Sequence, residues 1–527
     1  MALLLSLGAE AKVDYKVIPL PDHITMNDAQ GTFTLTKGAE VAYPAGNAQM
    51  LRNAKFAGEY FGLKPIVADK AQSPAVTLSL GLKNDNPDAY EIHVEMGGIR
   101  ILGASPSGVF YGMQTLRKSI ATESSDAIQL PCAIISATPR FGYRGTMLDC
   151  ARHFFTVDEV KEFIDILALH GQNRMHWHLT DDQGWRFEVK AFPKLAKKAG
   201  YRSNTIVGNN VEVVGRDGYT TGIFDNVPCQ GYYTQKQLRD IVRYAAERYI
   251  TIIPEIDLPG HMVAALSVYP ELGCTGGPYE VWRWWGISED VLCAGNPKVL
   301  DFLKTVYGEL CDIFPSELIH IGGDESPRNR WKECPKCQAK MKELGLQYEA
   351  QLQTYINVEL EKFLKQRGRR LIGWDETLEG GLSDDGIVMS WRGFEGGKKA
   401  AQLHHDVIMT PTQHCYIDYH QLKDPYRVPA VIYNYLPLSR VYAMEPIPAD
   451  LTPDEAKHII GCQCNLWTEH VASRDVLQFQ LLPRIAAMTE AQWMQPEAKN
   501  FDHFIERLPL LKALYTKLGY KFCSSWE

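Results

Sequence analysis

Two adjacent acids stand at the end of an apolar run in the segment LIHIGGDESPRNRW, residues 318–331. The run predicts a buried strand, and Gly322 and Gly323 after it would let a ligand or another backbone come close. Asp324 and Glu325 would then lie where the strand ends and leave it in different directions, as a hydrolase with two unlike carboxylates requires. The alternative is that Asp324 caps the next helix and Glu325 occupies its first turn.

The elements that would position these acids begin after Pro139, where candidate strands alternate with amphipathic helices. The candidate strands are residues 143–149, 174–180, 251–257, 317–322, 370–374, 386–391, 406–410 and 459–466. Eight strands in one run predict a parallel (β/α)8 barrel over residues 139–527, with its active site at the carboxyl ends of the strands.

Two helix starts support this assignment. Thr156 with Glu159 and Thr234 with Gln237 match the capping box, and each pair precedes an apolar stripe. Gly171 would end the first of these helices.

Two long irregular stretches, residues 201–233 and 271–296, follow strands and would therefore lie over the catalytic face. The second stretch carries Trp282, Trp284 and Trp285, which would either floor a sugar site or pack the loop.

The N-terminal part of the chain has a different pattern of predicted secondary structure. Short alternating segments between residues 15 and 137, with one helical segment among them, predict a small α+β domain with an antiparallel sheet. We expect a supporting, non-catalytic domain over residues 1–138. Residues 1–11, MALLLSLGAEA, are either the remnant of a secretion signal or a frayed terminus.

Composition narrows the class of partner. A chain of 527 residues with a net charge of −8 argues against nucleic acid and anionic membranes as partners and favours a neutral or weakly charged ligand. No apolar run is long enough to span a membrane. Among the twelve cysteines, the single CPKC at residues 334–337 favours a surface turn over a structural zinc, and Cys274 and Cys293 bracket a loop that they could close.

Ionisable or aromatic side chains follow all eight candidate strands. They are Arg152 and His153, Asp181 and Asp182, Glu255, Asp257 and His261, Asp324 and Glu325, Trp374, Asp375 and Glu376, Trp391 and Arg392, Tyr416 and Asp418, and Trp467 and Glu469. Clusters at every strand end exceed what structural ion pairs need and predict an active site. Flat indole walls beside hydrogen-bonding acids and arginines favour a sugar ligand. The single-residue alternatives are barrel packing of the tryptophans and pairing of Arg152 with Asp149 or Asp158.

Other reaction classes fit less well. The strand ends carry no GxSxG nucleophile motif and no phosphate-binding glycine loop, which argues against acyl and phosphoryl transfer. His176 and His178 alternate on the second strand, as ligands of a metal-dependent hydrolase would, but we favour hydrogen-bonded histidines of the inner barrel layer.

With these residues in view, the chain resembles the family 20 glycoside hydrolases, the β-N-acetylhexosaminidases, over nearly its whole length. The matching segments, in order, are RGTMLDCARHFF at 144–155, HWHLTDDQGWR at 176–186, PEIDLPGH at 254–261, HIGGDE at 320–325, GWDE at 373–376, SWRG at 390–393, YIDY at 416–419 and NLWTE at 465–469. The resemblance implies the same α+β domain and (β/α)8 barrel.

The resemblance also implies a retaining exoglycosidase that has no enzyme nucleophile. The substrate's own 2-acetamido oxygen would attack C1, and water would open the oxazolinium-like intermediate. Glu325 would be the general acid and then the base, while Asp324 would orient the acetamido group and balance the charge on its nitrogen. Glu325 would have to be protonated and Asp324 ionised at the working pH.

Further roles follow from the resemblance by position. Tyr416 would bind the acetamido carbonyl, and Asp181 and His261 would form a polar chain that supports Glu325. The walls and hydroxyl contacts would come from Trp374, Trp391, Trp467, Arg152, Asp418 and Glu469. No cofactor and no metal are expected. Cys274 and Cys293 resemble a loop disulfide of some members, which would suit a periplasmic, cell-surface or secreted protein.

The expected substrates are terminal β-N-acetylhexosaminides of oligosaccharides or glycoconjugates, and the oligomeric state is left open. Three rival functions are kept. The first is a family member that releases a disaccharide, as a lacto-N-biosidase does, or that acts on modified sugars. The others are a glycan-binding protein without turnover and a metal-dependent hydrolase.

Overall fold

The computed structural model describes residues 13–525 except 124, 208–210, 214–222, 384 and 425–431. Residues 1–11, for which a signal remnant or a frayed end was predicted, therefore lie outside the described residues. Within the described chain, every helix is too short or too polar to cross a membrane.

The chain forms two compact units. The first comprises residues 1–142, 169–171 and 493–522, and the second comprises residues 143–168, 172–492 and 523–527. The first unit thus includes α17 (Phe501–Leu518), which packs on α2 (Pro106–Ser119), whereas the predicted catalytic domain ran from 139 to the C-terminus. One bond within the unit is the 2.9 Å contact from the Arg507 guanidinium to the carbonyl of Val17.

The first unit is built on a seven-stranded sheet in the order β1-β9-β6-β7-β5-β3-β4. Its strands are β1 (His23–Met26), β3 (Glu40–Tyr43), β4 (Lys64–Val67), β5 (Val76–Leu80), β6 (Tyr90–Glu95), β7 (Gly98–Gly103) and β9 (Ala133–Ala137). The predicted antiparallel pairing holds from β1 to β7. From β7 to β4 the strands pair in parallel, and α1 (Ala48–Phe61) provides the crossover between β3 and β4.

The second unit is a closed barrel of eight parallel strands. They are β10 (Tyr143–Asp149), β11 (Arg174–His178), β17 (Thr251–Glu255), β19 (Leu318–His320), β20 (Arg370–Trp374), β21 (Ile387–Ser390), β22 (Val407–Met409) and β25 (Ile459–Leu466). Every candidate strand is confirmed, and the predicted (β/α)8 class with it.

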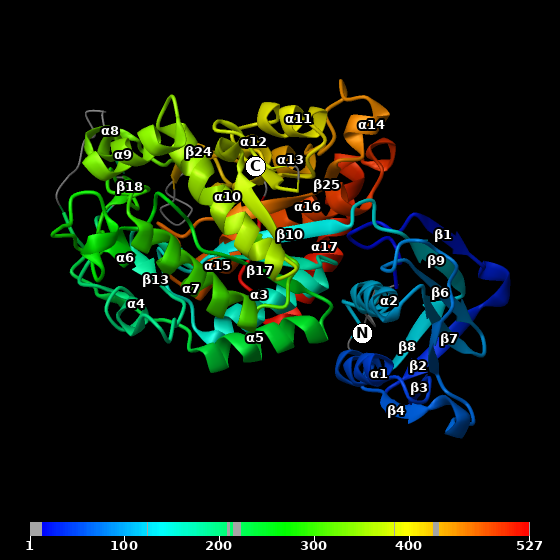
Figure 1. Ribbon diagram of the computed structural model, residues 1–527. Helices are drawn as coiled ribbons and strands as arrows, with labels where there is room; N and C mark the ends of the chain where they lie inside the picture. The colour runs from blue at the N-terminus through cyan, green and yellow to red at the C-terminus, as the bar shows by residue number, and fades with distance from the viewer. Residues whose placement is uncertain are drawn as a thin grey trace. The chain divides into compact units, whose positions relative to one another are not determined.

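Helices surround this barrel (Figure 1). The main ones are α3 (Val157–Leu169), α5 (Gln235–Glu247), α7 (Pro297–Ile313), α10 (Ala350–Gln366) and α11 (Glu395–Gln402). Both predicted capping boxes form, at Thr156 with Glu159 and at Thr234 with Gln237. Between β20 and β21 the connection is a short 3₁₀ turn, η4 (Asp375–Leu378), so the fifth strand lacks a full covering helix.

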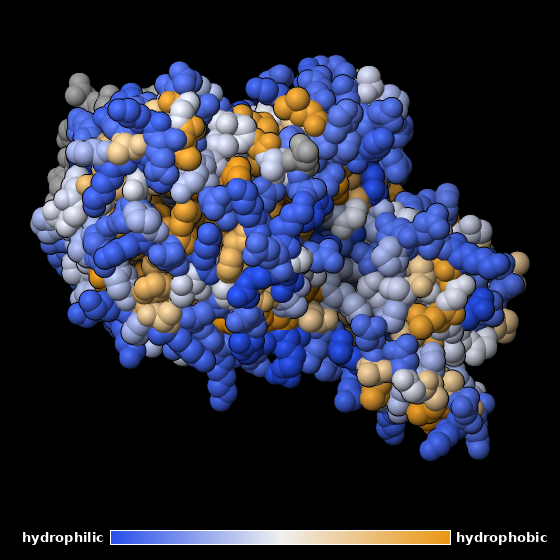
Figure 2. Space-filling view, viewed as in Figure 1, coloured by the Kyte–Doolittle hydropathy of each residue, from blue (hydrophilic) through white to orange (hydrophobic). Residues whose placement is uncertain are grey.

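The face of the molecule seen in Figure 2 is mostly hydrophilic, with its hydrophobic residues in small, separate groups. The large exposed apolar side chains, such as Met96, Ile134 and Leu403, come from distant parts of the sequence. This is an ordinary surface for a globular protein.

Two tryptophans of the loop before α7, Trp284 and Trp285, pack against neighbouring rings. Trp285 lies in β18 (Trp285–Ile287), is 3% exposed and contacts the rings of His153 and His470. The indole of Trp284 meets the ring of Phe224 edge-on at 5.4 Å. Of the two predicted roles, packing is the one that these contacts fit.

The predicted Cys274–Cys293 disulfide is wrong, because both residues are free cysteines in the structure. Their thiols instead meet those of Cys334 and Cys337 in one group of four, so each sulfur has competing neighbours.

Candidate active site

The turn that carries the paired acids has a left-handed backbone at three of its four positions. Gly322, Gly323 and Glu325 have φ values of 67°, 100° and 45°. A Cβ on Gly322 would lie 1.7 Å from Oδ1 of Asp257, and that same oxygen accepts a 3.0 Å bond from the Gly323 amide. The sequence predicted a ligand or a backbone beside these glycines, and the backbone of Asp257 does come close: its Cα would be 2.8 Å from a Cβ on Gly322, beside the carboxyl group of the same residue.

The helix-cap alternative for the two acids is wrong. The next helix, α8 (Asn329–Glu333), starts four residues after Glu325, and its N-cap residue is Arg328. Asp324 is only 9% exposed, whereas the side chain of Glu325 is 35% exposed. A non-glycine residue with positive φ is strained, and such strain concentrates at functional sites.

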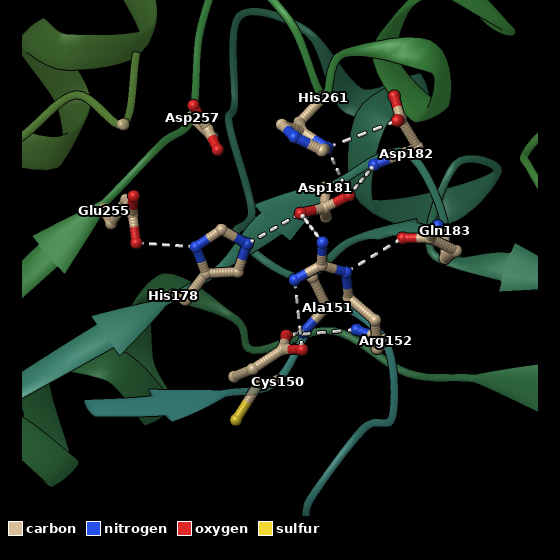
Figure 3. Close-up of polar contacts among 12 residues, drawn as sticks. Cys150, Ala151, Arg152, His178, Asp181, Asp182, Gln183, Glu255, Asp257 and His261 are labelled. Carbon is tan, nitrogen blue, oxygen red and sulfur yellow. Dashed lines mark hydrogen bonds and ion pairs between the residues drawn. The ribbon is translucent and has the colours of Figure 1, made fainter. Parts of the chain in front are cut away.

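A chain of charged contacts runs across the barrel rim to Glu325. Figure 3 shows its part from Glu255 through His178 and Asp181 to His261. Oε2 of Glu255 lies 2.5 Å from Nδ1 of His178, and Nε2 of His178 lies 3.0 Å from Oδ2 of Asp181. Oδ1 of Asp181 is 3.2 Å from Nδ1 of His261, whose Nε2 is 3.7 Å from Oε2 of Glu325. His261 also has a positive φ, 51°, which directs its ring into this chain.

The charges in this chain are set by its neighbours. Burial favours neutral imidazole in His261, but Asp181, Asp182 and Glu325 outweigh it and hold the pKa of His261 well above its ordinary value. Burial opposes ionisation of Asp181 as well, yet Arg152 and His261 hold its pKa well below the usual range. The chain therefore presents a cationic imidazole to Glu325.

Arg152, from the loop after β10, is shared among several acids. Its guanidinium is 2.8 Å from Asp181, 3.4 Å from Asp149 and 4.0 Å from Glu469, and it donates a 3.1 Å bond to Gln183. Pairing with Asp149, one of the structural alternatives, does occur. The contacts with Asp181 and Glu469 place the same arginine between the charge chain and the predicted sugar contacts.

Below the rim, histidines of the inner barrel layer contact the carboxylate of Glu255. Its carboxylate lies 2.9 Å from His176 and 3.1 Å from His320, and it accepts a 3.0 Å bond from the indole of Trp374. Burial opposes its ionisation, but His178, His320 and His176 hold the pKa of Glu255 well below its usual range. The predicted role of His176 and His178 as hydrogen-bonded residues of the inner layer agrees with these contacts.

Four aromatic rings form a continuous wall. The ring centroids of Trp374 and Trp467 are 6.0 Å apart, and those of Tyr416 and Trp467 are 6.4 Å apart. Trp391 stacks on Tyr416 at 6.1 Å with an interplanar angle of 23°, and its indole donates a 2.9 Å bond to Glu376. The rings come from the ends of four different strands. Trp391 lies nearly parallel to Tyr416, whereas Trp467 is tilted by 43° to Trp374 and by 47° to Tyr416.

Buried acceptors without partners lie beside this wall. One oxygen of Asp324, both of Asp418 and one of Glu469 have no hydrogen-bond partner within the described residues. A buried oxygen without a donor costs about 1–3 kcal/mol, so these atoms are expected to receive donors from a ligand.

The loop that carries Tyr416 and Asp418 is held from below by a buried arginine. The guanidinium of Arg484 donates to the carbonyl oxygens of Ile417, Tyr419 and Leu436, the last two at 2.9 and 3.1 Å. Asp418 is therefore fixed by its backbone, while its carboxylate stays available.

Asp324 has an unusual environment for an acid. Burial raises its pKa to about 6; His261 opposes the rise, and Glu325 and Glu255 add to it. Burial and Asp324 also raise the pKa of Asp257 well above its ordinary value, so Asp257 keeps its proton. The resemblance requires Asp324 to be ionised at the working pH, and with a pKa of about 6 the ionised form prevails only above that pH.

The structure brings together all eleven predicted site residues around one rim. The sequence placed Glu255 and Glu376 among the strand-end residues and His178 in the inner barrel layer, but it gave none of them a partner. The structure pairs Glu255 with His178 and Glu376 with Trp391. Gln183, which accepts a hydrogen bond from Arg152, was not singled out, and nothing in the local sequence marks it.

A closed parallel barrel whose carboxyl rim combines paired acids, an aromatic wall and unpartnered buried carboxylates is the architecture of a glycoside hydrolase. Residues 141–496 match the catalytic domain of glycosyl hydrolase family 20, and residues 14–136 match domain 2 of the same family. The chain belongs to glycosyl hydrolase family 20.

Individual proteins similar to this chain agree with the family assignment. The beta-hexosaminidase of Porphyromonas gingivalis is 40% identical over 507 residues, covering 93% of this chain and 62% of that protein. The beta-hexosaminidase of Vibrio furnissii is 34% identical, covering 90% and 75%. The structure of the exo-β-N-acetylglucosaminidase of Vibrio harveyi with N-acetylglucosamine superposes with a TM-score of 0.84 at 30% identity, covering 98% and 79%. The chain thus spans less than two thirds of the Porphyromonas relative.

We predict that Gly322→Ala destabilises the protein by about 2–5 kcal/mol, because the new Cβ meets the Asp257 carboxylate and the backbone is left-handed. Gly345→Ala is the matched control, since Gly345 has nearly the same φ, 66°, and open space around a Cβ. The control should lose only about 1–2 kcal/mol. Denaturant unfolding measures both, and equal losses would contradict the predicted clash.

Proposed function

We propose that the protein is an exo-acting, retaining β-N-acetylhexosaminidase that removes terminal β-linked N-acetylglucosamine or N-acetylgalactosamine. The observation that carries this proposal is the set of unpartnered buried oxygens on Asp324, Asp418 and Glu469 beside the wall of four aromatic rings. A sugar with one amide N–H and several hydroxyls supplies the missing donors, and its ring faces suit the indoles.

In the first step the acetamido oxygen of the substrate attacks C1, and the bond from C1 to the leaving oxygen breaks. Glu325 gives its proton to that leaving oxygen. Asp324 accepts a hydrogen bond from the acetamido N–H and balances the positive charge that develops on nitrogen. Burial and Asp324 hold the pKa of Tyr416 well above its ordinary value, so its hydroxyl stays protonated and can donate to the acetamido oxygen.

In the second step water attacks C1 from the face that the leaving group vacated. Glu325, now ionised, takes the proton of that water, and the bond from C1 to the acetamido oxygen breaks. His261 lies 3.7 Å from Glu325 and is held cationic by Asp181, so it stabilises the ionised form of Glu325 between the two steps.

The remaining contacts favour a terminal sugar. Asp418 and Glu469 need free hydroxyl groups as donors, and Arg152 stands within 4.0 Å of Glu469 to share the same hydroxyls. A further sugar attached at those hydroxyls would remove the donors. On the other side, Glu325 lines a pocket of about 350 Å³ that also includes Arg328, Glu379 and Arg392 and that we assign to the leaving group.

We propose an exported location on the sequence of residues 1–11 alone. Cell fractionation with an antibody against the full chain tests it, and recovery only in the cytoplasm would exclude it.

Replacing the proposed acid and base should nearly abolish turnover. Glu325→Gln is expected to lower kcat/KM for the nitrophenyl β-N-acetylglucosaminide by about 10²–10⁴-fold, since the amide can neither give nor take the proton. Glu333→Gln, an exposed glutamate on α8, is the control and should keep full activity. An inactive native protein, or an unchanged Glu325→Gln variant, would refute the proposed function.

On the acidic side of the pH profile, kcat/KM should follow the ionisation of Asp324. Its raised pKa, about 6, means that the carboxylate is lost as the pH falls below that value. We therefore expect kcat/KM to drop about tenfold per pH unit below pH 6, because it reports the free protein. The fall of kcat on the acidic side should occur at a lower pH than the fall of kcat/KM, because the acetamido N–H of the bound substrate favours ionised Asp324. A kcat/KM that stays flat through pH 5, in protein shown to remain folded, would contradict this assignment.

A further inference from the structure

Four cysteine thiols from two separate segments meet in the second unit. Cys274 and Cys293 belong to the long loop after β17, while Cys334 directly precedes α9 (Pro335–Leu344) and Cys337 lies in its first turn. The sulfur of Cys293 is 3.7 Å from those of Cys334 and Cys337, and the sulfur of Cys274 is 3.8 Å from that of Cys337. All four sulfurs lie within 4.8 Å of one another.

These separations match a metal site better than disulfides. Bonded sulfurs would be about 2.05 Å apart. Four thiolates bound tetrahedrally at about 2.3 Å from a zinc ion have their sulfurs about 3.8 Å apart. Cys293, Cys334 and Cys337 are buried and Cys274 is half-buried, so three of the four thiols are shielded from solvent.

We propose that Cys274, Cys293, Cys334 and Cys337 bind one structural Zn²⁺. The CPKC segment provides two ligands from a single turn, as zinc sites often do. The other two come from positions 274 and 293 of a loop, so no second CxxC marks the site. That spacing is why the sequence favoured a surface turn for CPKC, while a disulfide between Cys274 and Cys293 was expected from the resemblance.

The backbone segments around the thiols pack closely against each other. Gly295 lies so close to the second segment that a Cβ there would be 2.1 Å from the carbonyl of Lys336. Its amide reaches the sulfurs of both Cys293 and Cys337, a hydrogen bond that suits thiolates. The Cys293 amide donates a 2.8 Å bond to the carbonyl of Leu272, which fixes the loop beside Cys274.

The cluster ties together the two loops that carry His261 and Glu325. The indole of Trp331 donates a 2.9 Å bond to the carbonyl of Leu292, whose own amide donates to the carbonyl of Pro259 at 2.9 Å. A four-thiolate site has no open position for substrate, so the ion would cross-link these loops and take no part in the reaction.

Metal content tests the proposal on the full chain. Protein purified without a metal-affinity step should contain about one zinc per chain by elemental analysis. Titration with p-hydroxymercuribenzoate should release that zinc to a colorimetric chelator as four thiols react. Protein without zinc, protein with iron in its place, or disulfide-linked peptides joining these cysteines in non-reduced digests would overturn the proposal.

Variants locate the ion. Cys293→Ser and Cys337→Ser should each lose the zinc and unfold at a lower temperature than the native protein, whereas Cys311→Ser, which alters a buried cysteine on α7, should keep it. Zinc that persists in Cys293→Ser would place the ion elsewhere and refute the site. If that variant does not fold, zinc release from the native protein decides the question. This proposal does not rest on the sugar-hydrolase assignment.

Discussion

The buried carboxylate of Asp181 is the centre on which the catalytic rim depends. It contacts three cationic groups at once: Arg152 at 2.8 Å, His178 at 3.0 Å and His261 at 3.2 Å. Taking one carboxylate out of water costs several kcal/mol, and here three partners offset that cost. Because the partners come from three different strand ends, ionised Asp181 also fixes the positions of those ends relative to one another. Through His261 it reaches Glu325.

The two adjacent acids differ because the fold treats them differently. Asp324 is enclosed by Asp257, Tyr416 and the barrel end, whereas Glu325 turns outward in a left-handed backbone toward His261 and the leaving-group pocket. Gly322 makes this possible, since Asp257 occupies the space where a side chain would stand. In the ligand-free protein burial raises the pKa of Asp324 to about 6, so its carboxylate prevails only above that pH. A hydrogen bond from the substrate's N–H would favour the carboxylate further and extend its range to lower pH.

Much of this architecture could be predicted because it depends on local patterns. Hydrophobic periodicity and capping boxes such as Thr234 with Gln237 located the strands and helices, and the carboxyl ends of the strands located the site. Contacts between distant segments could not be predicted in this way. The 2.9 Å bond from Trp391 to Glu376 and the meeting of Cys274 with Cys337 depend on loop conformations that leave no periodic signal. The hydrogen bond between Asp324 and Asp257 likewise joins residues sixty-seven positions apart and leaves no local signal.

The central claim is that the nucleophile belongs to the substrate and that the protein only positions it. The most direct measurement is kcat/KM for a series of nitrophenyl glycosides whose acetamido methyl group carries zero, one, two or three fluorines. Fluorine withdraws electrons from the amide oxygen, so the account predicts a steep fall in kcat/KM with each added fluorine. Rates that do not depend on fluorination would show that the amide oxygen does not attack C1 and would contradict the account.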